Sequence, residues 1–434
     1  MFSYFLGIAL LGSFVLSMPF VYKNHVPADY IDALFTSVSA VCVTGLSTLN
    51  MDVYSTAGFV VIMALIELGG LGLISFVAFY LAAPKRKVSL VNRTIIKEFF
   101  VDDVEYDPKK ILASIIAFTL FCEIVASLFL FFLFKKDGSR QPFLDGIFHA
   151  VSAFCNAGFS TYSTSLNSLG DDRLLLAIIM ALIVLGGLGF IVLSDALSVI
   201  RRKKNRLSHH SLIVMLFTLF LILSGSFLFF LLEYNHAFRG LSLSDKVIAS
   251  LFQSITPRTA GFSVIDQVDF SPTSNLLVMM LMFIGGSPGS IAGGVKTTTF
   301  LIVVMYALRG NADKRGLNLL KRNINTAALE KSFNIIAKSF MIILLSVMLL
   351  SITERPSLVS GSFKVFDIMF ESISAFGTVG LSMGITGDLS FLGRIVIILT
   401  MFIGRTGIVA MALGFIRDEK ERYFEYPSAS IMVG

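Results

Sequence analysis

Long apolar runs alternate with short polar segments along the whole chain. A run of about 20 apolar residues can cross a lipid bilayer as a helix, and such runs recur throughout the 434 residues. A shorter amphipathic stretch that ends in a glycine lies between the two runs of each pair. One run, residues 276–308, also carries glycines, a proline and a lysine near its middle. This pattern predicts an all-α polytopic membrane protein.

The unit of apolar run, amphipathic stretch and second apolar run occurs four times. Three of the four amphipathic stretches match closely: DALFTSVSAVCVTGLS from Asp32, DGIFHAVSAFCNAGFS from Asp145 and DIMFESISAFGTVGLS from Asp367. The remaining stretch, DKVIASLFQSITPRTAGFS from Asp245, belongs to the third unit and is longer. The second runs contain LGGLG, LGGLG, IGGSPG and IGRTG, and their glycines follow the closing glycine by 24, 28, 24 and 24 residues. Two coupled motifs in four registers predict four pseudo-symmetric repeats around one central pore.

The motifs set the expected boundaries of these repeats. In the third repeat we expect helix to about Ile284, irregular chain from Gly285 to Gly294, and helix again to Leu308. The four repeats are residues 1–100 with a pore loop at 32–48, 101–208 with a pore loop at 145–161, 209–326 with a pore loop at 245–264 and a broken second span at 276–308, and 327–434 with a pore loop at 367–383 and a short cytoplasmic C-terminal tail.

Each amphipathic stretch is too short to cross the membrane. The ten residues from Asp32 to Val41 would make roughly 15 Å of helix, against about 30 Å of hydrocarbon. A half-length helix that enters and returns is a pore helix, and Asp32, Asp145 and Asp367 stand where an N-cap is expected. The C-terminal ends of such helices would direct partial negative charge toward the axis, which favours a cation there.

The residues after each pore helix are the candidate ion-binding residues. Glycine adopts backbone angles that other residues avoid, so it can turn carbonyl groups inward. A ring of carbonyl oxygens can replace the hydration shell of a monovalent cation. The alternative is that these are ordinary re-entrant packing segments. The predicted filter residues are Val43, Thr44, Gly45, Asn156, Ala157, Gly158, Thr259, Ala260, Gly261, Thr378, Val379 and Gly380.

The interrupted run predicts an intramembrane loop beneath the ring, and its small residues are suited to a gate. Non-helical backbone is tolerated at this depth only when it is buried in protein or lines a wet cavity. We expect Arg405 to donate to carbonyls of the loop and to add a positive barrier, the alternative being a structural clamp. Lys296 either belongs to the gate or extends to the cytoplasmic interface. The gate residues are Gly285, Gly286, Ser287, Pro288, Gly289, Ser290, Gly293, Gly294, Lys296 and Arg405.

Composition and charge support a membrane protein rather than a nucleic-acid binder. The chain is 55% hydrophobic and 15% charged, whereas soluble domains have about 25% charged residues. The net charge of +6 arises mostly between apolar runs: segments that follow second runs hold 22 of the 35 Lys and Arg residues, and those around the glycine stretches hold 11. Because cytoplasmic loops collect basic residues, we expect a multi-pass protein of the cytoplasmic membrane with both termini in the cytoplasm.

Other polar residues in the apolar runs receive structural interpretations. We expect Glu67 and Glu123 to hydrogen-bond between helices and His149 to be a packing residue. Cys42 and Cys155 each precede a stretch glycine by three, and no further ligands are placed to make them metal sites. The runs contain no paired aspartates, no HExxH motif and no nucleophile with a nearby base, so we do not expect an enzyme.

Three further features concern the pore loops and the gate. We expect Glu371 to brace the backbone behind the ring. Arg258 is expected near the outer mouth, where it would tune ion entry or brace the neighbouring loop. GSIAGGVKT resembles a phosphate-binding loop, but Val295 separates the glycine from the lysine, so we expect no nucleotide or other cofactor on this chain.

The segments CVTGL, NAGF, TPRTAGF, SAFGTVGLSMG and MFIGRTG resemble those of the Ktr/Trk/HKT superfamily of potassium transporters over nearly the whole chain. The chain most resembles the membrane subunit of the bacterial Ktr system. This resemblance implies a homodimer with one pore per subunit, potassium as substrate, the 285–294 loop as gate, and a cytosolic ring of nucleotide-binding regulatory subunits. Sodium is a possible activator, with no residue assigned to it. A sodium-preferring or unselective member is the alternative, although Gly45 favours potassium because serine there accompanies sodium in the superfamily.

Overall fold

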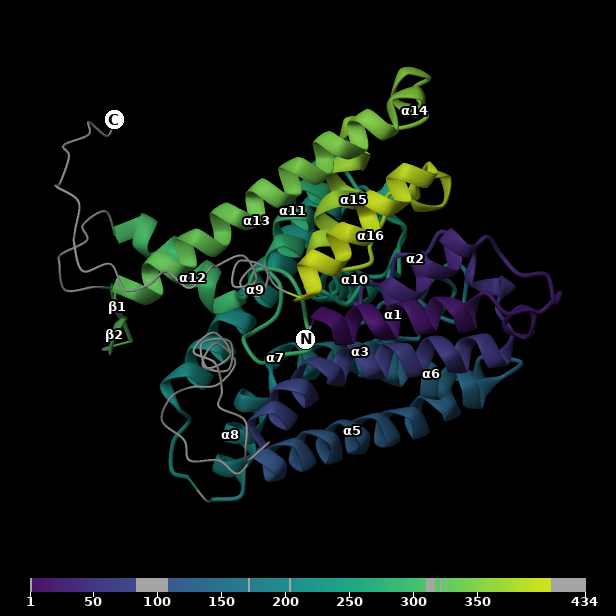
Figure 1. Cartoon of the computed structure of the whole chain (residues 1–434). Helices are drawn as coiled ribbons and strands as arrows, with labels where there is room; N and C mark the ends of the chain where they lie inside the picture. Colours follow the sequence, from purple (N-terminus) through teal and green to yellow (C-terminus); the bar gives the residue numbers. More distant parts are fainter. Residues whose placement is uncertain are drawn as a thin grey trace, which may run out of the picture.

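The computed structural model describes residues 2–82, 108–170, 172–202, 204–309, 317–320, 322–324 and 326–406. These residues are mostly helical, as the apolar runs predict (Figure 1). One small antiparallel sheet pairs β1 (Leu317–Leu319) with β2 (Arg322–Ile324). The expected boundary at residue 100 and the expected C-terminal tail lie outside the described residues.

The same order of elements occurs four times in the described chain. A first helix is followed by a short helix, a 3₁₀ turn, and a further helix that is broken in the second and third occurrences. In chain order these are α1 (Phe2–Leu16), η1 (Pro19–Val21), α2 (Tyr30–Val41), η2 (Met51–Val53) and α3 (Thr56–Ala82); α5 (Pro108–Lys136), α6 (Pro142–Phe154), η3 (Asn167–Leu169), α7 (Arg173–Leu188) and α8 (Phe190–Ile200); α9 (His209–Glu233), α10 (Leu243–Ile255), η4 (Gln267–Asp269), α11 (Pro272–Phe283) and α12 (Thr297–Arg309); and α13 (Thr326–Thr353), α14 (Arg355–Val359), α15 (Val365–Gly377), η5 (Thr386–Asp388) and α16 (Phe391–Thr406).

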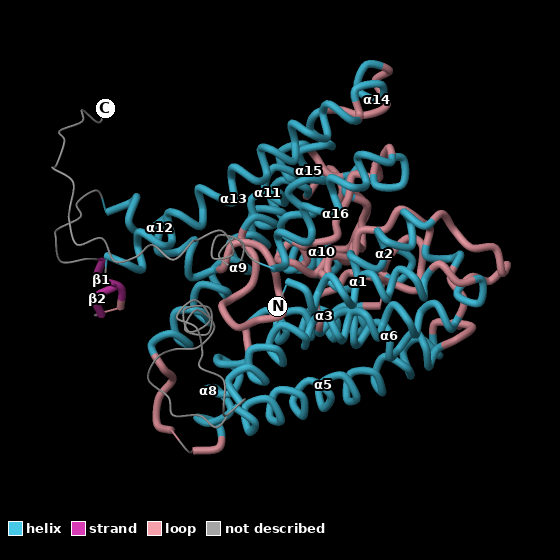
Figure 2. The backbone as a smooth tube through the Cα atoms, viewed as in Figure 1, coloured by secondary structure: helices cyan, strands magenta, loops and turns pink. Residues whose placement is uncertain are grey.

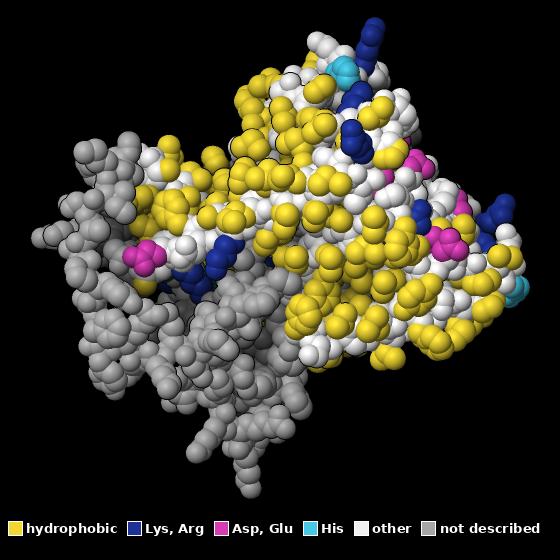
Figure 3. Space-filling model, turned by 45° about the horizontal axis from the view of Figure 1, so that its top comes forward, with side chains coloured by type: hydrophobic (Ala, Val, Ile, Leu, Met, Phe, Trp, Pro, Cys, Tyr) yellow, Lys and Arg dark blue, Asp and Glu magenta, His cyan; other side chains and the backbone are white. Residues whose placement is uncertain are grey.

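The outer surface of the helical bundle is apolar. Within the described residues, three helical segments are long and apolar enough to cross a membrane: Ala113–Lys136, His209–Glu233 and Thr326–Thr353. The pair α7 and α8 passes the same test together, although it bends by 104°. Figure 3 shows hydrophobic side chains spread over the described part of one face, with most charged side chains toward its edges. Such a surface suits lipid contact rather than water.

The short helices α2, α6, α10 and α15 carry an aspartate in their first turn. The expectation that Asp32, Asp145 and Asp367 are N-caps is wrong, because each helix begins two or three residues earlier. The carboxylate of Asp32 accepts a bond of 2.6 Å from Thr48, and that of Asp145 accepts one of 2.6 Å from Thr161. These bonds tie the start of each helix to the chain that returns from its far end.

The apolar run at residues 276–308 is interrupted between two helices. Helix α11 ends at Phe283 and α12 begins at Thr297, and Figure 2 draws the chain between them as loop. The two ends of this loop are joined because Gly285 N donates to Val295 O at 2.8 Å and Thr297 N donates to Gly286 O at 3.1 Å. The two ends of the loop therefore lie side by side, and most of the loop between them is buried in the bundle.

Candidate functional site

The structure brings the four stretch glycines together. A Cβ added to Gly45 would lie 2.5 Å from Ala157 O and 3.1 Å from Gly158 Cα, and one added to Gly158 would lie 2.8 Å from Ala260 O. Side chains at Gly261 and Gly380 would likewise overlap the carbonyl oxygens of Val379 and Thr44. Each glycine thus contacts the segment that holds the next, and the fourth contacts the first, so the four segments form a closed ring.

The backbone of these segments repeats the same unusual conformation. All four glycines have positive φ, between 71° and 96°. The residues two positions earlier are also left-handed, a conformation that β-branched residues rarely adopt. Sequence inspection indicated the glycines but gave no signal for these other positions, which are Val43 (φ 56°), Asn156 (57°), Thr259 (72°) and Thr378 (49°).

Hydrogen bonds to the short helices hold this conformation. The N–H groups of Thr44 and Val379 donate to Ser39 O at 2.8 Å and Ser374 O at 2.9 Å. Gly45 N also donates to Ser39 Oγ at 3.0 Å. The equivalent N–H groups of Ala157 and Ala260 donate to Ser152 O and Thr256 O.

The carbonyl oxygens of the same residues face the ring without a partner. Those of Thr44, Ala157, Ala260 and Val379 lie against the neighbouring glycines, and none accepts a hydrogen bond from another described residue. All four residues are completely buried. Buried carbonyl groups are nearly always paired, so this ring of oxygens is suited to a cation or to water.

A cavity of about 410 Å³ opens on one side of the ring. Its walls come from all four glycines and from the chain that follows each of them. The lining includes Gly45, Ser47, Gly158, Ser160, Gly261, Ser263, Gly380 and Ser382. Such a vestibule gives hydrated ions access to the ring.

The irregular loop between α11 and α12 packs against the residues that precede the fourth glycine. A Cβ on Gly293 would overlap the Thr378 side chain, and one on Gly294 would lie 3.5 Å from Gly377 Cα. Because the vestibule is lined by residues after the glycines, the loop lies on the other side of the ring. A Cβ on Gly286 would lie 2.8 Å from Ser290 Oγ, so the loop also folds tightly on itself.

The loop is also bonded to the break between α7 and α8. Ser287 N donates to Gly187 O at 3.0 Å, and Ser287 Oγ donates to Leu188 O. Phe190 N donates to Gly289 O at 3.2 Å. Gly189 has φ 87°, and a side chain there would collide with the Pro288 carbonyl. The bend of 104° therefore fits around the loop.

Two cationic side chains donate to the loop. Arg405, which is buried, donates through Nη1 to Ile291 O and through Nη2 to Gly69 O at 2.7 Å, so it joins the loop to α3. Lys296, half-buried, donates to Ala292 O at 2.6 Å. Both side chains therefore contact the predicted gate.

The glycines of the second apolar runs allow close packing in three of the four repeats. Side chains on Gly69, Gly186 and Gly404 would overlap the carbonyl oxygens at the ends of α2, α6 and α15. In the third repeat, a side chain on Gly285 would instead overlap Gly293 of its own loop. The break in this helix therefore replaces a contact with the short helix.

His149 and Glu371 both hydrogen-bond to the chain that follows a ring glycine. His149 bonds to Asp145 O at 2.8 Å and to Ser160 Oγ at 2.9 Å, as expected for a packing residue. Glu371 accepts from Ser382 at 2.9 Å and thereby braces the chain after Gly380.

Arg258 was expected near the outer mouth, and that expectation is wrong. Arg258 is buried and lines a small pocket with Gly187 and Gly286, away from the vestibule, because its helix end packs against the broken helices.

Sequence inspection also missed two buried carboxylates at the ends of long helices. Glu233 accepts from Ser271 N at 3.0 Å, and Glu354 accepts from Ser390 N at 3.1 Å. Each joins the end of one long helix to the start of a later one. The only signal in the sequence is an acidic residue at the end of an apolar run.

The chain matches the family model TrkH, described as cation transport protein, over residues 13–426. It is 38% identical over 441 residues to the potassium/sodium uptake protein NtpJ of Enterococcus hirae, covering 99% of this chain and 95% of that protein. It is 33% identical to the Ktr system potassium uptake protein B of Vibrio alginolyticus, covering 99% and 93%. The crystal structure of the potassium transporter TrkH from Vibrio parahaemolyticus superposes with a TM-score of 0.75 at 18% identity, covering 96% of this chain and 83% of that one.

Proposed function

The chain belongs to the TrkH family of cation transport proteins, and we propose that it carries potassium into the cell across the cytoplasmic membrane. It is a membrane protein of a transporter family rather than an enzyme family. Potassium would be its substrate and would bind at the ring formed by the four glycine segments, the predicted filter.

The observation that carries this proposal is the set of unpartnered carbonyl oxygens in the ring. The oxygens of Thr44, Ala157, Ala260 and Val379 are buried, and the N–H groups of the same residues are already bonded to the short helices. Backbone carbonyls in such a ring can replace the water around a monovalent cation. The C-terminal ends of α2, α6, α10 and α15 add partial negative charge beside it.

The loop from Gly285 to Gly294 would regulate passage beneath the ring. It packs against Thr378 on the side opposite the vestibule, and Arg405 and Lys296 donate to its carbonyls. Displacement of the loop would require the bond from Arg405 to break, whereas the bond from Lys296 lies within the chain between α11 and α12. This supports a gate that opens without changing the ring.

A sodium-preferring or unselective transporter is the second candidate. The relative from Enterococcus hirae is named a potassium/sodium uptake protein, so the family permits either ion. Glycine rather than serine at Gly45 favours potassium.

The names of relatives in the Ktr system imply further subunits. We propose that the chain forms a homodimer, with both termini of each chain in the cytoplasm, and binds a cytosolic ring of nucleotide-binding regulatory subunits.

Uptake in cells that lack potassium transport tests the function. Cells expressing the chain, with or without the regulatory subunit, are supplied with rubidium or sodium. We expect rubidium uptake to exceed sodium uptake. Greater sodium uptake would favour the second candidate, and no uptake of either ion in the presence of the regulatory subunit would contradict both.

A matched pair of glycine variants tests the filter. Gly261 has φ 79° and contacts the ring, whereas Gly361 has φ 80° and nothing within 4 Å of an added Cβ. Both Gly261→Ala and Gly361→Ala introduce the same backbone strain, but only the first obstructs the ring. We expect only Gly261→Ala to abolish rubidium uptake at equal protein level. Equal uptake by the two variants would contradict the proposed filter.

A further inference from the structure

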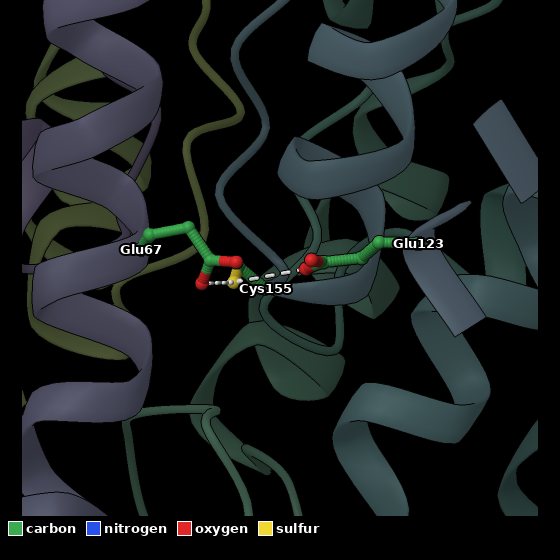
Figure 4. Close-up of side chains that lie close together, drawn as sticks. All are labelled: Glu67, Glu123 and Cys155. Atoms are coloured by element: carbon green, nitrogen blue, oxygen red, sulfur yellow. Dashed lines mark hydrogen bonds between the residues drawn. The ribbon is translucent and has the colours of Figure 1, made fainter. Parts of the chain in front are cut away.

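Three side chains that can bind a metal converge behind the second glycine segment. Figure 4 shows Glu67 of α3 and Glu123 of α5 extending toward Cys155 from two sides. Cys155 Sγ lies 3.6 Å from Glu67 Oε2 and 4.0 Å from Glu123 Oε1, and one ligand atom from each residue lies within 4.8 Å of the others. We propose that this cluster binds a divalent transition-metal ion such as Zn²⁺.

The separations suit a tetrahedral ion. Bonds of about 2.3 Å to sulfur and about 2.0–2.2 Å to oxygen place sulfur and oxygen ligands about 3.6 Å apart. The distances from Cys155 to Glu67 and Glu123 are close to this value. A thiolate with two carboxylates suits Zn²⁺, whereas potassium and sodium prefer oxygen ligands alone.

The charge of the cluster also favours a cation. Cys155 and Glu123 are buried and Glu67 is half-buried. No described Lys or Arg forms an ion pair with either carboxylate. Ionisable groups at this depth in a membrane protein usually pair with an opposite charge or serve an ion. A divalent ion would neutralise most of the negative charge.

A fourth polar group lies on the same face of α5. Thr119 is completely buried, and its Oγ1 has no hydrogen-bond partner in the described part of the chain. Thr119 stands four residues before Glu123, so the two share a helix face, and helical side chains lean toward the N-terminus. Thr119 and Glu123 therefore lie on one face of α5, and we expect the Thr119 hydroxyl to be available to a metal-bound water.

A metal bound at the cluster would restrain the elements around the second glycine segment, including those that contact the loop. A Cβ on Gly70 would lie 2.9 Å from Cys155 Sγ and 3.3 Å from Ile291 Cγ2 in the loop. The preceding residue, Gly69, accepts the bond from Arg405. A metal would therefore fix α3, α5 and the second glycine segment together beside the loop. We expect it to slow transport, a consequence that rests on the proposed function.

Cobalt binding to the purified full chain in detergent tests the site. Co²⁺ on a thiolate gives a charge-transfer absorption band, which reports cysteine ligation directly. We expect about one equivalent of Co²⁺ to produce the band, and Zn²⁺ to abolish it by displacement. Cys155→Ser should remove the band, whereas Glu67→Gln and Glu123→Gln should weaken binding about tenfold or more.

Cys42→Ser is the matched control, because Cys42 is also buried and also precedes a ring glycine by three. It should leave the band unchanged, and size-exclusion elution should show that every variant is folded. Absence of the band in the unsubstituted protein, or its retention in Cys155→Ser, would overturn the proposal and indicate a cluster held by shared protons.

Rubidium flux into liposomes with and without Zn²⁺ tests the consequence separately. Zn²⁺ should slow flux through the unsubstituted protein but not through Cys155→Ser. A cobalt band with Zn²⁺-insensitive flux would leave the site standing and overturn its link to transport. A cobalt band without any rubidium flux would instead count against the proposed function.

Discussion

Replacement of Arg405 by alanine should increase ion flux. The substitution removes the donor to Ile291 O in the loop and the donor to Gly69 O in α3. Only the first of these bonds ties the loop in place, so only that bond enters the estimate for the gate. A hydrogen bond from a charged donor contributes about 1.5–3 kcal/mol. Its loss would shift the equilibrium toward the displaced loop by roughly 10- to 150-fold.

Rubidium flux into liposomes at equal protein density measures this effect. The increase should reach the tenfold range and level off once the loop no longer limits passage. Arg394→Ala is the control, because Arg394 lies on the same helix but bonds to Asp32 and to the Leu389 and Gly387 carbonyls, away from the loop. Unchanged flux in Arg405→Ala, or an equal rise in Arg394→Ala, would refute the reasoning.

Arg405→Lys separates the two roles considered for this residue. Lysine keeps the positive charge but cannot bridge two carbonyl groups with a planar fork. If the charge forms the barrier, flux should stay low in Arg405→Lys. If the bridge holds the loop, flux should rise nearly as far as in Arg405→Ala.

Three further substitutions, the first with a matched control, test other contacts. Ser287→Ala removes the hydroxyl bond to Leu188 O, so rubidium flux in liposomes should rise roughly two- to tenfold, whereas Ser290→Ala, whose bond lies within the loop, should change it less. Glu371→Gln turns an acceptor of two hydroxyl bonds into a partial donor, so the rubidium-to-sodium uptake ratio should fall; an unchanged ratio would contradict a bracing role. Glu354→Gln weakens the join between α13 and α16, so thermal unfolding in detergent should show a loss of about 1–3 kcal/mol with the uptake ratio unchanged.

Local sequence was sufficient for the parts of this fold that depend on composition. Apolar runs predict helices because lipid contact and internal hydrogen bonding both favour them. Positive φ at Gly45 and its three counterparts could be anticipated because glycine alone adopts it without strain. The left-handed conformation of Val43 could not, because it results from bonds between the segment and the end of its short helix.

The pentapeptide LGGLG shows where local sequence fails. At residues 68–72 it lies inside the continuous helix α3, whereas at residues 185–189 the helix ends at Leu188 and the chain bends. Identical residues have different conformations because the second copy packs against the irregular loop and bonds to it. Only tertiary contact decides between the two outcomes.

The cluster of Glu67, Glu123 and Cys155 was missed for a related reason. The expectation that no further ligands are placed beside Cys155 is wrong, because Glu67, which is 88 residues away along the chain, and Glu123 both lie beside it. The packing of α3, α5 and α6 brings the three side chains together. A single sequence carries no signal for such a convergence.

In three of the four repeats, Gly69, Gly186 or Gly404 packs the second helix directly against the end of the short helix, whereas Gly285 of the third repeat packs against its own loop. The close contact found in the other three repeats is thereby replaced in the repeat that carries the proposed gate. If the proposed gate opens by movement of the loop, a displacement confined to the third repeat could widen the path while the other three repeats keep the ring oxygens in register. If the proposed filter and gate are right, a change in one of four similar units would be enough to make a passage that opens and closes while it stays selective.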